Sequence, residues 1–523
     1  MASSSSSSKW NRLKFPFVIL LIGLLFLITN YIFFTVSYDT LQLGRDEWFE
    51  KTDESTGPEW YEAIAREFKD ESFNVGLVNV GPPVRSTKAK LLRVDFDRVG
   101  ESVRWAHLAP ERIDENSTCP GMPMPRFEDY RDLDVVVAGG VEHCKDVVFR
   151  LQVNLVVANL LVRSGRKEKN RPVYAVFVGS CEPMWEIFRC DDLLSNEGNS
   201  HVYKPELARI KELVDMPVGP CQFVPPFSHF GDQDLWKNTN HITTQINNHN
   251  KKHDENRHSK EAYVTVLHTS EDYVCGAIVL AQSIIQSNST KDLILLADEN
   301  ISPRSINALR AAGWQTKLIQ RIRSPYSKQN TYNEWNYSKL RIWQLTQYEK
   351  IIFIDSDLIV NTNLDKFFTY PQLTAAGNYQ KHFFNSGLML VEPSECAFET
   401  LLKKMTVVES YNGGDQGFLN EMFAWWHRLP AQTNYLKVFV DAKDRLHYVD
   451  GKYVFAVHYT GLKPWKCGDE ESDCNWDVPE FHRYASNSAH KIWWKVYKSM
   501  PEDLRAYCLL YRDKNGALSP KGL

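Results

Sequence analysis

The segment Ile351-Ile352-Phe353-Ile354-Asp355-Ser356-Asp357 places a run of apolar residues directly before two carboxylates that are one residue apart. Such a run is typical of a strand buried on both faces of a parallel sheet. These sheets bind ligands beyond the carboxyl ends of their strands, which is where Asp355 and Asp357 would lie. Two acids at this spacing can hold a hard divalent cation, which can neutralise a diphosphate. The segment therefore predicts a metal-assisted phosphate site, with a solvated loop as the alternative.

Two further Asp-x-Asp triplets show that the triplet is informative only in context. Asp132 and Asp134 precede a strand-like run, which is the wrong end of a strand for a ligand site. Asp95 and Asp97 lie in an alternating segment, where outward-facing acids on a strand are expected. Only the triplet quoted above directly follows a buried-type strand, so it alone is kept as the candidate site.

The residues around this strand alternate between short apolar runs and helical patterns. The expected order is a strand at 263–267, a helix at 273–286, a strand at 293–297, helices at 303–312 and 337–345, and a strand at 351–354. This alternation predicts an α/β fold with a mainly parallel sheet that is covered by helices on both faces.

Three polar motifs follow downstream. They are Phe384-Asn385-Ser386-Gly387 before the apolar run 388–391, Gly413-Gly414-Asp415-Gln416-Gly417 before a helix-like segment, and residues 458–465 after the strand-like run 453–457. Glycines followed by polar amides let a sugar approach the backbone closely, although the first two motifs also suit ordinary turns. A neutral imidazole at His458 can complete a metal shell, and Lys463 offers a point charge for phosphate.

The chain upstream of this pattern divides by composition. Strand-like runs at 133–138 and 173–178 enclose the apolar, helix-like stretch 147–161, which is a βαβ signature. Residues 231–260 are polar with few apolar residues, as in a linker, and the irregular spacing of their histidines favours a solvated loop over a metal site. We therefore expect an upstream α/β domain, without an assigned role, at 74–230.

The N-terminus predicts a membrane anchor. Residues 15–36 carry no charge and form a stretch of 22 residues, long enough to cross a hydrocarbon core as a helix. A cleaved signal peptide usually has a shorter apolar region and a small-residue cleavage site, neither of which is found here. Cations precede the stretch and acids follow it, which predicts a cytosolic tail at 1–14 and a lumenal remainder. Residues 37–73 are expected to form a stem, and a buried core helix is the alternative for 15–36.

Cysteines and glycosylation sequons also fit a lumenal body. The ten cysteines lack zinc-like spacing. The pairs Cys467 with Cys474 and Cys181 with Cys190 each bracket a short loop and could form disulfides, with buried thiols as the alternative. N-glycosylation sequons lie at Asn116, Asn288, Asn300 and Asn336. The last of these adjoins candidate functional residues, and we expect it to be unmodified.

Composition limits the class of protein. The 523 residues are 43% hydrophobic and 24% charged, which excludes wholesale disorder and a fibrous repeat. The formal charge of -4, without a local basic face, argues against a nucleic-acid partner. Aromatic residues make up 12% of the chain, which suits a large core and also sugar-binding surfaces.

The ordered motifs of residues 263–465 resemble glycosyltransferase family eight, the glycogenin-like retaining transferases. The residues that carry the resemblance are Leu267, Thr269, Tyr273, Ser338-Lys339-Leu340, Asp355-Ser356-Asp357, Asn385-Ser386-Gly387, Gly413-Gly414-Asp415-Gln416 and His458 to Trp465. With the anchor, the stem and the upstream domain, the chain is similar to the plant branch whose members add glucuronic acid to xylan in the Golgi.

The resemblance implies a GT-A catalytic domain at 261–523, with a C-terminal extension. It implies a manganese ion at Asp355, Asp357 and His458, with uridine at Leu267, Thr269 and Tyr273 and the diphosphate at Lys339 and Lys463. The donor sugar would contact Asn385, Ser386, Asp415 and Gln416. Lys339 and Asp415 are the catalytic candidates. The wider set of expected substrate-binding residues adds Ser356, Gly387, Asn412, Gly413, Gly414 and Gly461.

Two departures from the family pattern bear on the donor. Glycogenin has Asp where this chain has Asn412, a position near the sugar hydroxyls, and the step from Gly461 to Lys463 is one residue shorter. A glucuronate carboxylate in a cleft needs a cationic partner, because leaving it desolvated and unpaired costs several kcal/mol. Lys381 or His382, just upstream of the Asn385 loop, is the expected partner, with a solvated loop as the alternative.

These motifs together predict an enzyme. The resemblance implies that this enzyme moves glucuronic acid from UDP-glucuronate to xylan with retention of the α configuration, using manganese, in the Golgi membrane, where other cell-wall transferases are candidate partners. A different UDP-sugar or acceptor is one alternative. A catalytically silent Golgi scaffold is another, although a scaffold has no need of metal and phosphate residues.

Overall fold

The computed structural model describes residues 59–69, 71–81, 88–104, 107, 122–139, 147–167, 171–215, 260–378, 383–439, 447–467, 470–508, 510–512 and 518–520. The expected tail, anchor and most of the stem, the linker apart from Lys260, the sequon Asn116, and Lys381 and His382 lie outside these residues. Ala63–Leu523 forms one compact unit. Of the other unit, Met1–Glu62, the structure describes only 59–62, at the start of helix α2 (Glu59–Phe68).

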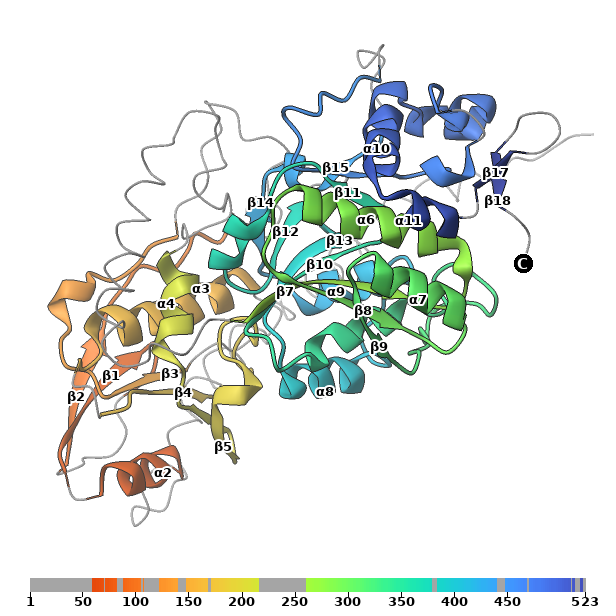
Figure 1. Cartoon of the computed structure of the whole chain (residues 1–523). Helices are drawn as coiled ribbons and strands as arrows, with labels where there is room; N and C mark the ends of the chain where they lie inside the picture. The colour runs from red at the N-terminus through yellow and green to blue at the C-terminus, as the bar shows by residue number, and fades with distance from the viewer. Residues whose placement is uncertain are drawn as a thin grey trace, which may run out of the picture. The chain divides into compact units, whose positions relative to one another are not determined.

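A seven-stranded sheet forms the centre of the catalytic region (Figure 1), in the order β14-β12-β13-β10-β7-β8-β9. Its strands are β7 (Glu261–Leu267), β8 (Asp292–Ala297), β9 (Gln315–Leu318), β10 (Lys350–Ile354), β12 (Thr374–Gly377), β13 (Phe384–Val391) and β14 (His427–Leu429). Only β13 runs antiparallel to its neighbours in this sheet, β10 and β12. The expectation of a mainly parallel sheet is therefore confirmed.

Helices cover both faces of this sheet. They are α6 (Val274–Gln286), α7 (Pro303–Ala311), α8 (Glu395–Lys404), α9 (Asp415–Met422), α10 (Asn487–Ser499) and α11 (Glu502–Tyr507). Alternate residues of β10 enter two different cores: Ile352 and Ile354 pack with α6, whereas Ile351 and Phe353 pack with α8 and α9. This period of two is what a strand buried on both faces requires.

The helix expected at 337–345 is a 3-10 helix, η7 (Asn336–Gln344), rather than an α-helix. Three residues at a spacing of three, Tyr337, Leu340 and Trp343, are fully buried on it. Side chains three apart eclipse one another in a 3-10 helix, so this geometry directs all three into one core. Other 3-10 turns are η3 (Phe127–Asp129), η5 (Cys190–Asp192), η6 (Glu271–Tyr273), η8 (Asp365–Thr369), η9 (Ala431–Asn434), η10 (Pro464–Lys466), η11 (Cys474–Asp477) and η12 (Pro479–Tyr484).

A small three-stranded sheet carries part of the site. It consists of β11 (Leu358–Val360), β16 (Ala456–His458) and β15 (Tyr435–Leu436), in the order β11-β16-β15. The antiparallel register of β11 and β16 places His458 opposite Leu358, which brings the imidazole beside the end of the Asp-x-Asp triplet. A short hairpin, β17 (Leu510–Arg512) and β18 (Leu518–Pro520), follows near the C-terminus.

The upstream region contains its own six-stranded sheet, in the order β2-β1-β3-β4-β6-β5. Its elements are β1 (Phe73–Val78), β2 (Ala89–Val94), β3 (Val135–Ala138), α3 (Val147–Asn159) continued by η4 (Leu160–Ser164), β4 (Tyr174–Val178), β5 (Leu193–Glu197), β6 (Ser200–Tyr203) and α4 (Leu207–Asp215). Strands β3 and β4 are parallel with α3 between them, so the expected βαβ unit is confirmed.

The helix at Val147–Ser164 is apolar and long enough to cross a membrane, and within the described part of the chain it alone meets that test. Its residues are mostly buried, 78% of the window, and they form the core of the upstream sheet. It is therefore a core helix.

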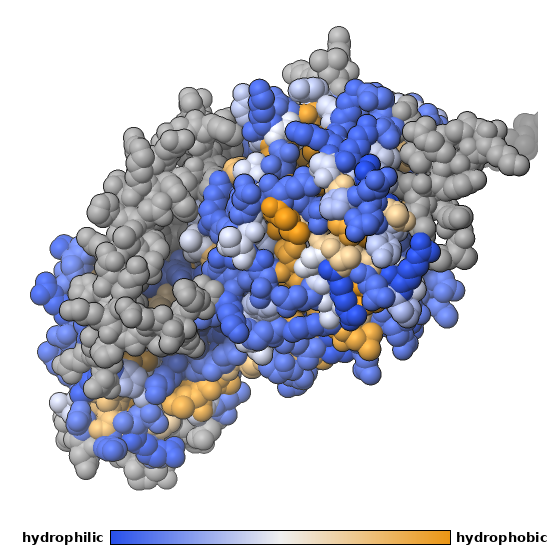
Figure 2. Space-filling view, in the orientation of Figure 1, coloured by the Kyte–Doolittle hydropathy of each residue, from blue (hydrophilic) through white to orange (hydrophobic). Residues whose placement is uncertain are grey.

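On the face in view in Figure 2 the surface is mainly hydrophilic, and hydrophobic residues show only in narrow patches.

Disulfides confirm one expected pair and correct the other. Cys467 and Cys474 are bonded as expected. Cys190 is bonded to Cys396 rather than to Cys181, because η5 packs against the start of α8 and brings sulfurs together that are 206 residues apart.

The two remaining Asp-x-Asp triplets are structural or exposed. The Asp134 carboxylate, for example, is buried and accepts hydrogen bonds from Arg166 and Arg171.

Candidate active site

One cavity of about 1460 Å³ collects the chemistry-bearing residues of the catalytic region. It opens at the carboxyl ends of β7 and β10, where β13 and α9 begin and β16 ends. Its wall contains every expected site residue except Gly413 and Gly414, which form the turn before α9. The antiparallel direction of β13 explains how Asn385 and Ser386 arrive here: these residues lie inside the strand, not before it, and its first residues meet the end of β10.

Asp357 is held between two cavity residues. Its Oδ2 lies 2.6 Å from Nζ of Lys463, and its Oδ1 lies 3.3 Å from Nε2 of His458. Burial by itself raises the pKa of the Asp357 carboxyl, but Lys463 and His458 outweigh burial and hold that pKa well below its usual range. The carboxylate is therefore negatively charged in the cavity.

His458 is oriented by an amide. Its Nδ1 lies 3.1 Å from Oδ1 of Asn434, which leaves Nε2 to face the carboxylates. Gly387 gives the ring its room, because a Cβ at that position would lie 2.5 Å from Cε1 of His458. Asp355, Asp357 and His458 each offer one ligand atom, and these atoms lie within 4.8 Å of one another. Two carboxylate oxygens and an oriented imidazole nitrogen suit a divalent cation such as manganese.

Lys339 joins the triplet to the downstream motifs. Its Nζ lies 2.6 Å from Oδ2 of Asp415 and 3.3 Å from Oδ1 of Asp355, and it donates to the carbonyl of Ser386 at 3.2 Å. The hydroxyl of Ser386 donates to the same Asp415 oxygen at 2.8 Å. Burial lowers the pKa of Lys339, but Asp355 and Asp415 outweigh burial and raise it, so the ammonium is retained.

The amides of the downstream motifs form a hydrogen-bonded chain. Asn385 Nδ2 donates to Oε1 of Gln416 at 3.0 Å, and Gln416 Nε2 donates to the hydroxyl of Tyr411 at 2.7 Å. Asn434 Nδ2 donates to Oδ1 of Asn385 at 2.8 Å. Because Asn434 also contacts His458, one network connects the expected sugar-binding amides with the expected metal ligands.

Asn412 has a structural task. Its Oδ1 accepts hydrogen bonds from the backbone N–H of Gly414 at 2.9 Å and of Gly417 at 3.1 Å, which satisfies free donors at the start of α9. A carboxylate oxygen of Asp would accept the same bonds. The difference from glycogenin at this position therefore leaves the helix start intact.

The end of β7 forms another part of the wall. Leu267 is buried, and Thr269, with a positive φ of 76°, donates its backbone N–H to Oδ2 of Asp298 at 3.0 Å. Between them lies His268, whose pKa is lowered by burial to about 4, so its imidazole is neutral at physiological pH. The ring of Tyr273 lies 5.8 Å from Nζ of Lys463.

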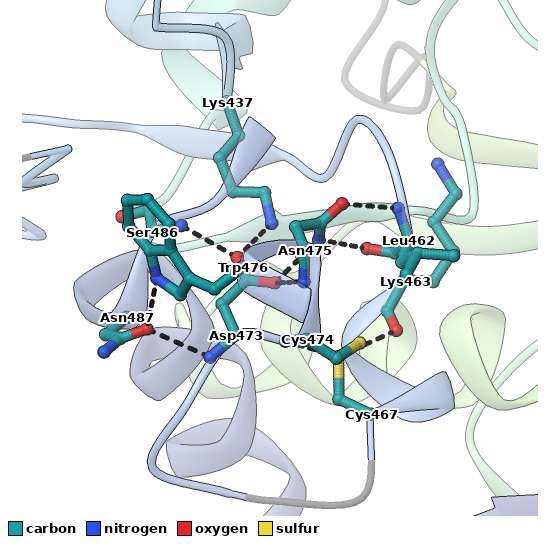
Figure 3. The surroundings of a disulfide bond; sticks show 10 residues. All are labelled: Lys437, Leu462, Lys463, Cys467, Asp473, Cys474, Asn475, Trp476, Ser486 and Asn487. Carbon is teal, nitrogen blue, oxygen red and sulfur yellow. Dashed lines mark hydrogen bonds and ion pairs between the residues drawn. A yellow bond between two sulfur atoms is a disulfide. The ribbon is translucent and has the colours of Figure 1, made fainter. Parts of the chain in front are cut away.

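A clamp fixes the loop that carries Lys463. The side chain of Asn475 accepts from the backbone N–H of Leu462 at 2.8 Å and donates to the Leu462 carbonyl at 2.9 Å (Figure 3). Asp473 accepts from Asn475 at 2.6 Å and pairs with the fully buried Lys437 at 2.6 Å. The disulfide at Cys467 closes this segment (Figure 3).

The sequence analysis missed several of these residues. Asn434 is 24 residues from His458, whose ring it contacts, and Asn475 is 13 residues from Leu462, whose backbone it contacts. No local sequence pattern marks either residue. Asp298 could have been found, because it directly follows the strand-like run 293–297 at the ligand-binding end of the sheet.

An α/β sheet that presents a carboxylate pair, a histidine, the buried Lys339 and the half-buried Lys463 at its ligand-binding edge suits a transferase that acts on a nucleotide sugar. The chain also matches two family models: Glycosyl transferase family 8 over residues 264–374, and the GUX1-5 N-terminal domain over residues 50–221. The chain belongs to glycosyltransferase family 8, in the branch of the plant xylan alpha-glucuronosyltransferases, and it is a UDP-sugar glycosyltransferase.

Three relatives illustrate this placement. UDP-glucuronate:xylan alpha-glucuronosyltransferase 2 of Arabidopsis thaliana is 45% identical over 81% of this chain and 72% of its own length. An Arabidopsis thaliana protein provisionally named alpha-glucuronosyltransferase 4 of the same series is 47% identical over 87% of this chain and 83% of its own length. Human glycogenin-1 is 29% identical over 45% of this chain and 71% of its own length.

Proposed function

We propose that the protein transfers a glucuronosyl group from UDP-glucuronate to a xylan chain. The observation that carries this proposal is the charged constellation at one cavity, Lys463 with Asp357 and Lys339 with Asp415, in a chain 45% identical to a named UDP-glucuronate:xylan alpha-glucuronosyltransferase. The two lysines can bind the diphosphate leaving group, and Asp415 can bind the sugar. The identities of the donor and the acceptor come from the names of the relatives.

The cavity residues also fit a manganese ion. Asp355, Asp357 and His458 would hold it, and the bound cation would neutralise charge on the diphosphate. Lys463 lies beside Asp357, so its ammonium adds positive charge at the expected diphosphate position. A β-phosphate oxygen would contact this point charge.

The remaining residues have separable tasks in the reaction. Lys339, held by Asp415, keeps a second positive charge next to the departing diphosphate. Asn385 and Gln416 are aligned by mutual hydrogen bonding and can bind the donor sugar hydroxyls. The acceptor hydroxyl attacks C1 of the sugar on the face from which the diphosphate leaves, the bond from C1 to the diphosphate oxygen breaks, and the hydroxyl proton passes to an oxygen of the departing diphosphate, so the α configuration is retained.

Asp415 is the carboxylate among the residues expected to contact the donor sugar, and it lies in the cavity wall. Its Oδ2 is already engaged by Lys339 and by the hydroxyl of Ser386, so its role is to bind and orient the sugar. No covalent sugar–enzyme bond is required by this arrangement.

The sequence and the disulfides support a proposal for the location of the protein. Disulfides such as Cys275–Cys508 support an oxidising compartment. Asn288 and Asn300 are exposed, as glycosylated residues must be, whereas the side chain of Asn336 is half-buried and bonded to Asn333. We place the chain in the Golgi membrane with its catalytic region in the lumen, alongside other cell-wall transferases. Protease added to intact Golgi vesicles should then spare nearly the whole chain, and loss of the catalytic region would refute this orientation.

Product analysis tests the chemistry. Purified protein is incubated with UDP-glucuronate, xylohexaose and Mn²⁺, and the product is examined by mass spectrometry and proton NMR. We expect one glucuronosyl unit added in α linkage. A β linkage would refute retention, and release of UDP without any transfer to xylohexaose would refute the acceptor.

A further inference from the structure

The cavity is larger than a typical small-molecule pocket. Pockets for small molecules usually measure about 300 to 1,000 Å³, against about 1460 Å³ here. The residues expected to bind the donor account for the part at the carboxyl ends of the strands. Another part of the wall comes from β15 and the segment after it and from η12. We call this part the acceptor wall, and its residues are Leu436, Val438, Phe481, Arg483 and Tyr484.

The acceptor wall has the chemistry of a sugar-binding surface. The rings of Phe481 and Tyr484 lie 6.1 Å apart at an interplanar angle of 44°, and both are partly exposed. Aromatic rings pack against the apolar C–H faces of pyranose sugars. The guanidinium of Arg483 lies over the Tyr484 ring at 4.6 Å and offers several N–H donors to hydroxyl groups.

Arg483 differs from the other cations of the cavity. Arg321, Lys339, Lys463 and Lys466 are each paired with a carboxylate. Within the described ranges, no carboxylate lies within ion-pair distance of the exposed Arg483. Its donors therefore face the cavity without a fixed acceptor, which suits a ligand that brings its own oxygen atoms.

The acceptor wall adjoins the place where the new bond would form. Leu436 pairs in register with His458, one of the expected metal ligands. Gly461 has a φ of 77°, and a Cβ on it would lie 2.8 Å from Cβ of Tyr484. Tyr484 thus packs against the loop that carries Lys463, beside the expected diphosphate position.

The acceptor wall is held rigidly. The backbone N–H of Phe439 donates to the carbonyl of Arg483 at 2.7 Å. Asp473, paired with the buried Lys437, accepts the backbone N–H of Ser486 at 2.8 Å, just beyond η12 (Figure 3). A surface fixed before binding loses little conformational freedom when its ligand binds.

We propose that the acceptor wall is a subsite for a sugar chain, which it presents to the donor by stacking on Tyr484 and Phe481 and by hydrogen bonds from Arg483. The chemical class of the ligand is a linear oligosaccharide of pyranose units. This inference rests on the proposed function, and it names where the acceptor of that reaction is bound.

Titration calorimetry of the full chain with xylohexaose, in the presence of UDP and Mn²⁺, tests the subsite without requiring turnover. We expect Tyr484→Ala and Phe481→Ala each to weaken xylohexaose binding by about tenfold, while the affinity for UDP stays unchanged. Tyr484→Phe keeps the ring and should retain binding, which also separates ring loss from misfolding. Tyr453→Ala, at a 58% exposed tyrosine outside the cavity, is the matched control.

Two results would overturn the subsite. One is equal xylohexaose binding by wild type and Tyr484→Ala, and the other is an equal loss of UDP affinity in the same variant. If xylohexaose binds as expected but receives no sugar, the subsite holds and the proposed function fails. If it is glucuronidated with an unchanged KM in Tyr484→Ala, the proposed function holds and the subsite fails.

Discussion

The ammonium of Lys463 lies 2.6 Å from Oδ2 of Asp357. A residue expected to bind the diphosphate is therefore in direct contact with a residue expected to bind the metal. Burial of Lys463 lowers the pKa of its ammonium, but Asp357 outweighs burial and raises it. The two charges stabilise each other in the cavity, and either one left alone would be a buried, unpaired charge. We therefore expect the binding of metal and of diphosphate to be coupled through this pair.

Removing a metal ligand should abolish transfer while the fold persists. We expect Asp357→Ala and His458→Ala to reduce kcat by at least about a thousandfold, because the diphosphate charge is left uncompensated. Transfer rates and far-UV circular dichroism are measured together. Exposed Asp272→Ala, beside Lys466 at the rim, is the control. Full activity in either ligand variant would remove Asp357 and His458 from the site.

Metal removal should act through the same residues. We expect EDTA to inactivate the enzyme and Mn²⁺ to restore it. Mn²⁺ with UDP should also raise Tm in the wild type, because ligands that bind only the folded state stabilise it. Asp357→Ala should show no such rise. An EDTA-treated enzyme that keeps its full rate would contradict a metal at this site.

The Asn475 clamp should control diphosphate binding from a distance. Asn475→Ala removes both hydrogen bonds to the Leu462 backbone, so we expect UDP binding to weaken about tenfold and stability to fall by about 1–3 kcal/mol. Asn475→Asp keeps an acceptor for the Leu462 N–H but puts a second buried carboxylate against Asp473, so it should not restore UDP binding or stability. UDP affinity by calorimetry and Tm are the measurements. Unchanged UDP affinity in Asn475→Ala would show that the Lys463 loop holds its position without the clamp.

Glu186 should make stability depend on pH. Its carboxyl is buried, it accepts the backbone N–H of Trp425 at 3.2 Å, and burial raises its pKa from 4.5 to about 7. Below pH 4.5 the carboxyl is protonated in both the folded and unfolded states. As pH rises from 4.5 to 7 the unfolded state loses its proton first, so the free energy of unfolding falls, by about 3 kcal/mol in all.

Glu186→Gln removes this ionisation. We expect the variant to be more stable than wild type at pH 8 and equally stable at pH 4, by urea unfolding at both values. Exposed Glu399→Gln should leave the pH dependence of the wild type unchanged. Parallel pH profiles for the wild type and Glu186→Gln would show that the carboxyl is not the source.

The fold could be predicted where local pattern and burial agree. The run at 351–354 alternates between two cores, and its position before Asp355 identified the ligand-binding edge of the sheet. Most of the site followed, because the ends of parallel strands meet at one edge. The direction of β13 was not predictable from its residues, because a buried strand reads alike in either orientation.

Long-range contacts were beyond the sequence. The bond from Cys190 to Cys396 depends on how two sheets pack, whereas the short spacing to Cys181 suggested a local pair. The amides of Asn434 and Asn475 contribute through tertiary contacts that carry no spacing signal. The expected carboxylate partners Lys381 and His382 remain predictions, because they lie outside the described residues.

The most direct test of the central claim compares donors one at a time. The claim is that this cavity uses UDP-glucuronate for transfer to xylan. Purified protein with xylohexaose and Mn²⁺ is given UDP-glucuronate, UDP-glucose, UDP-galactose and UDP-galacturonate in turn, with Asp357→Ala as the blank. We predict that kcat/KM for UDP-glucuronate exceeds that for each other donor by at least about a hundredfold, which corresponds to about 3 kcal/mol of transition-state binding. Equal or greater kcat/KM with any other donor, or transfer that persists in Asp357→Ala, would contradict the account.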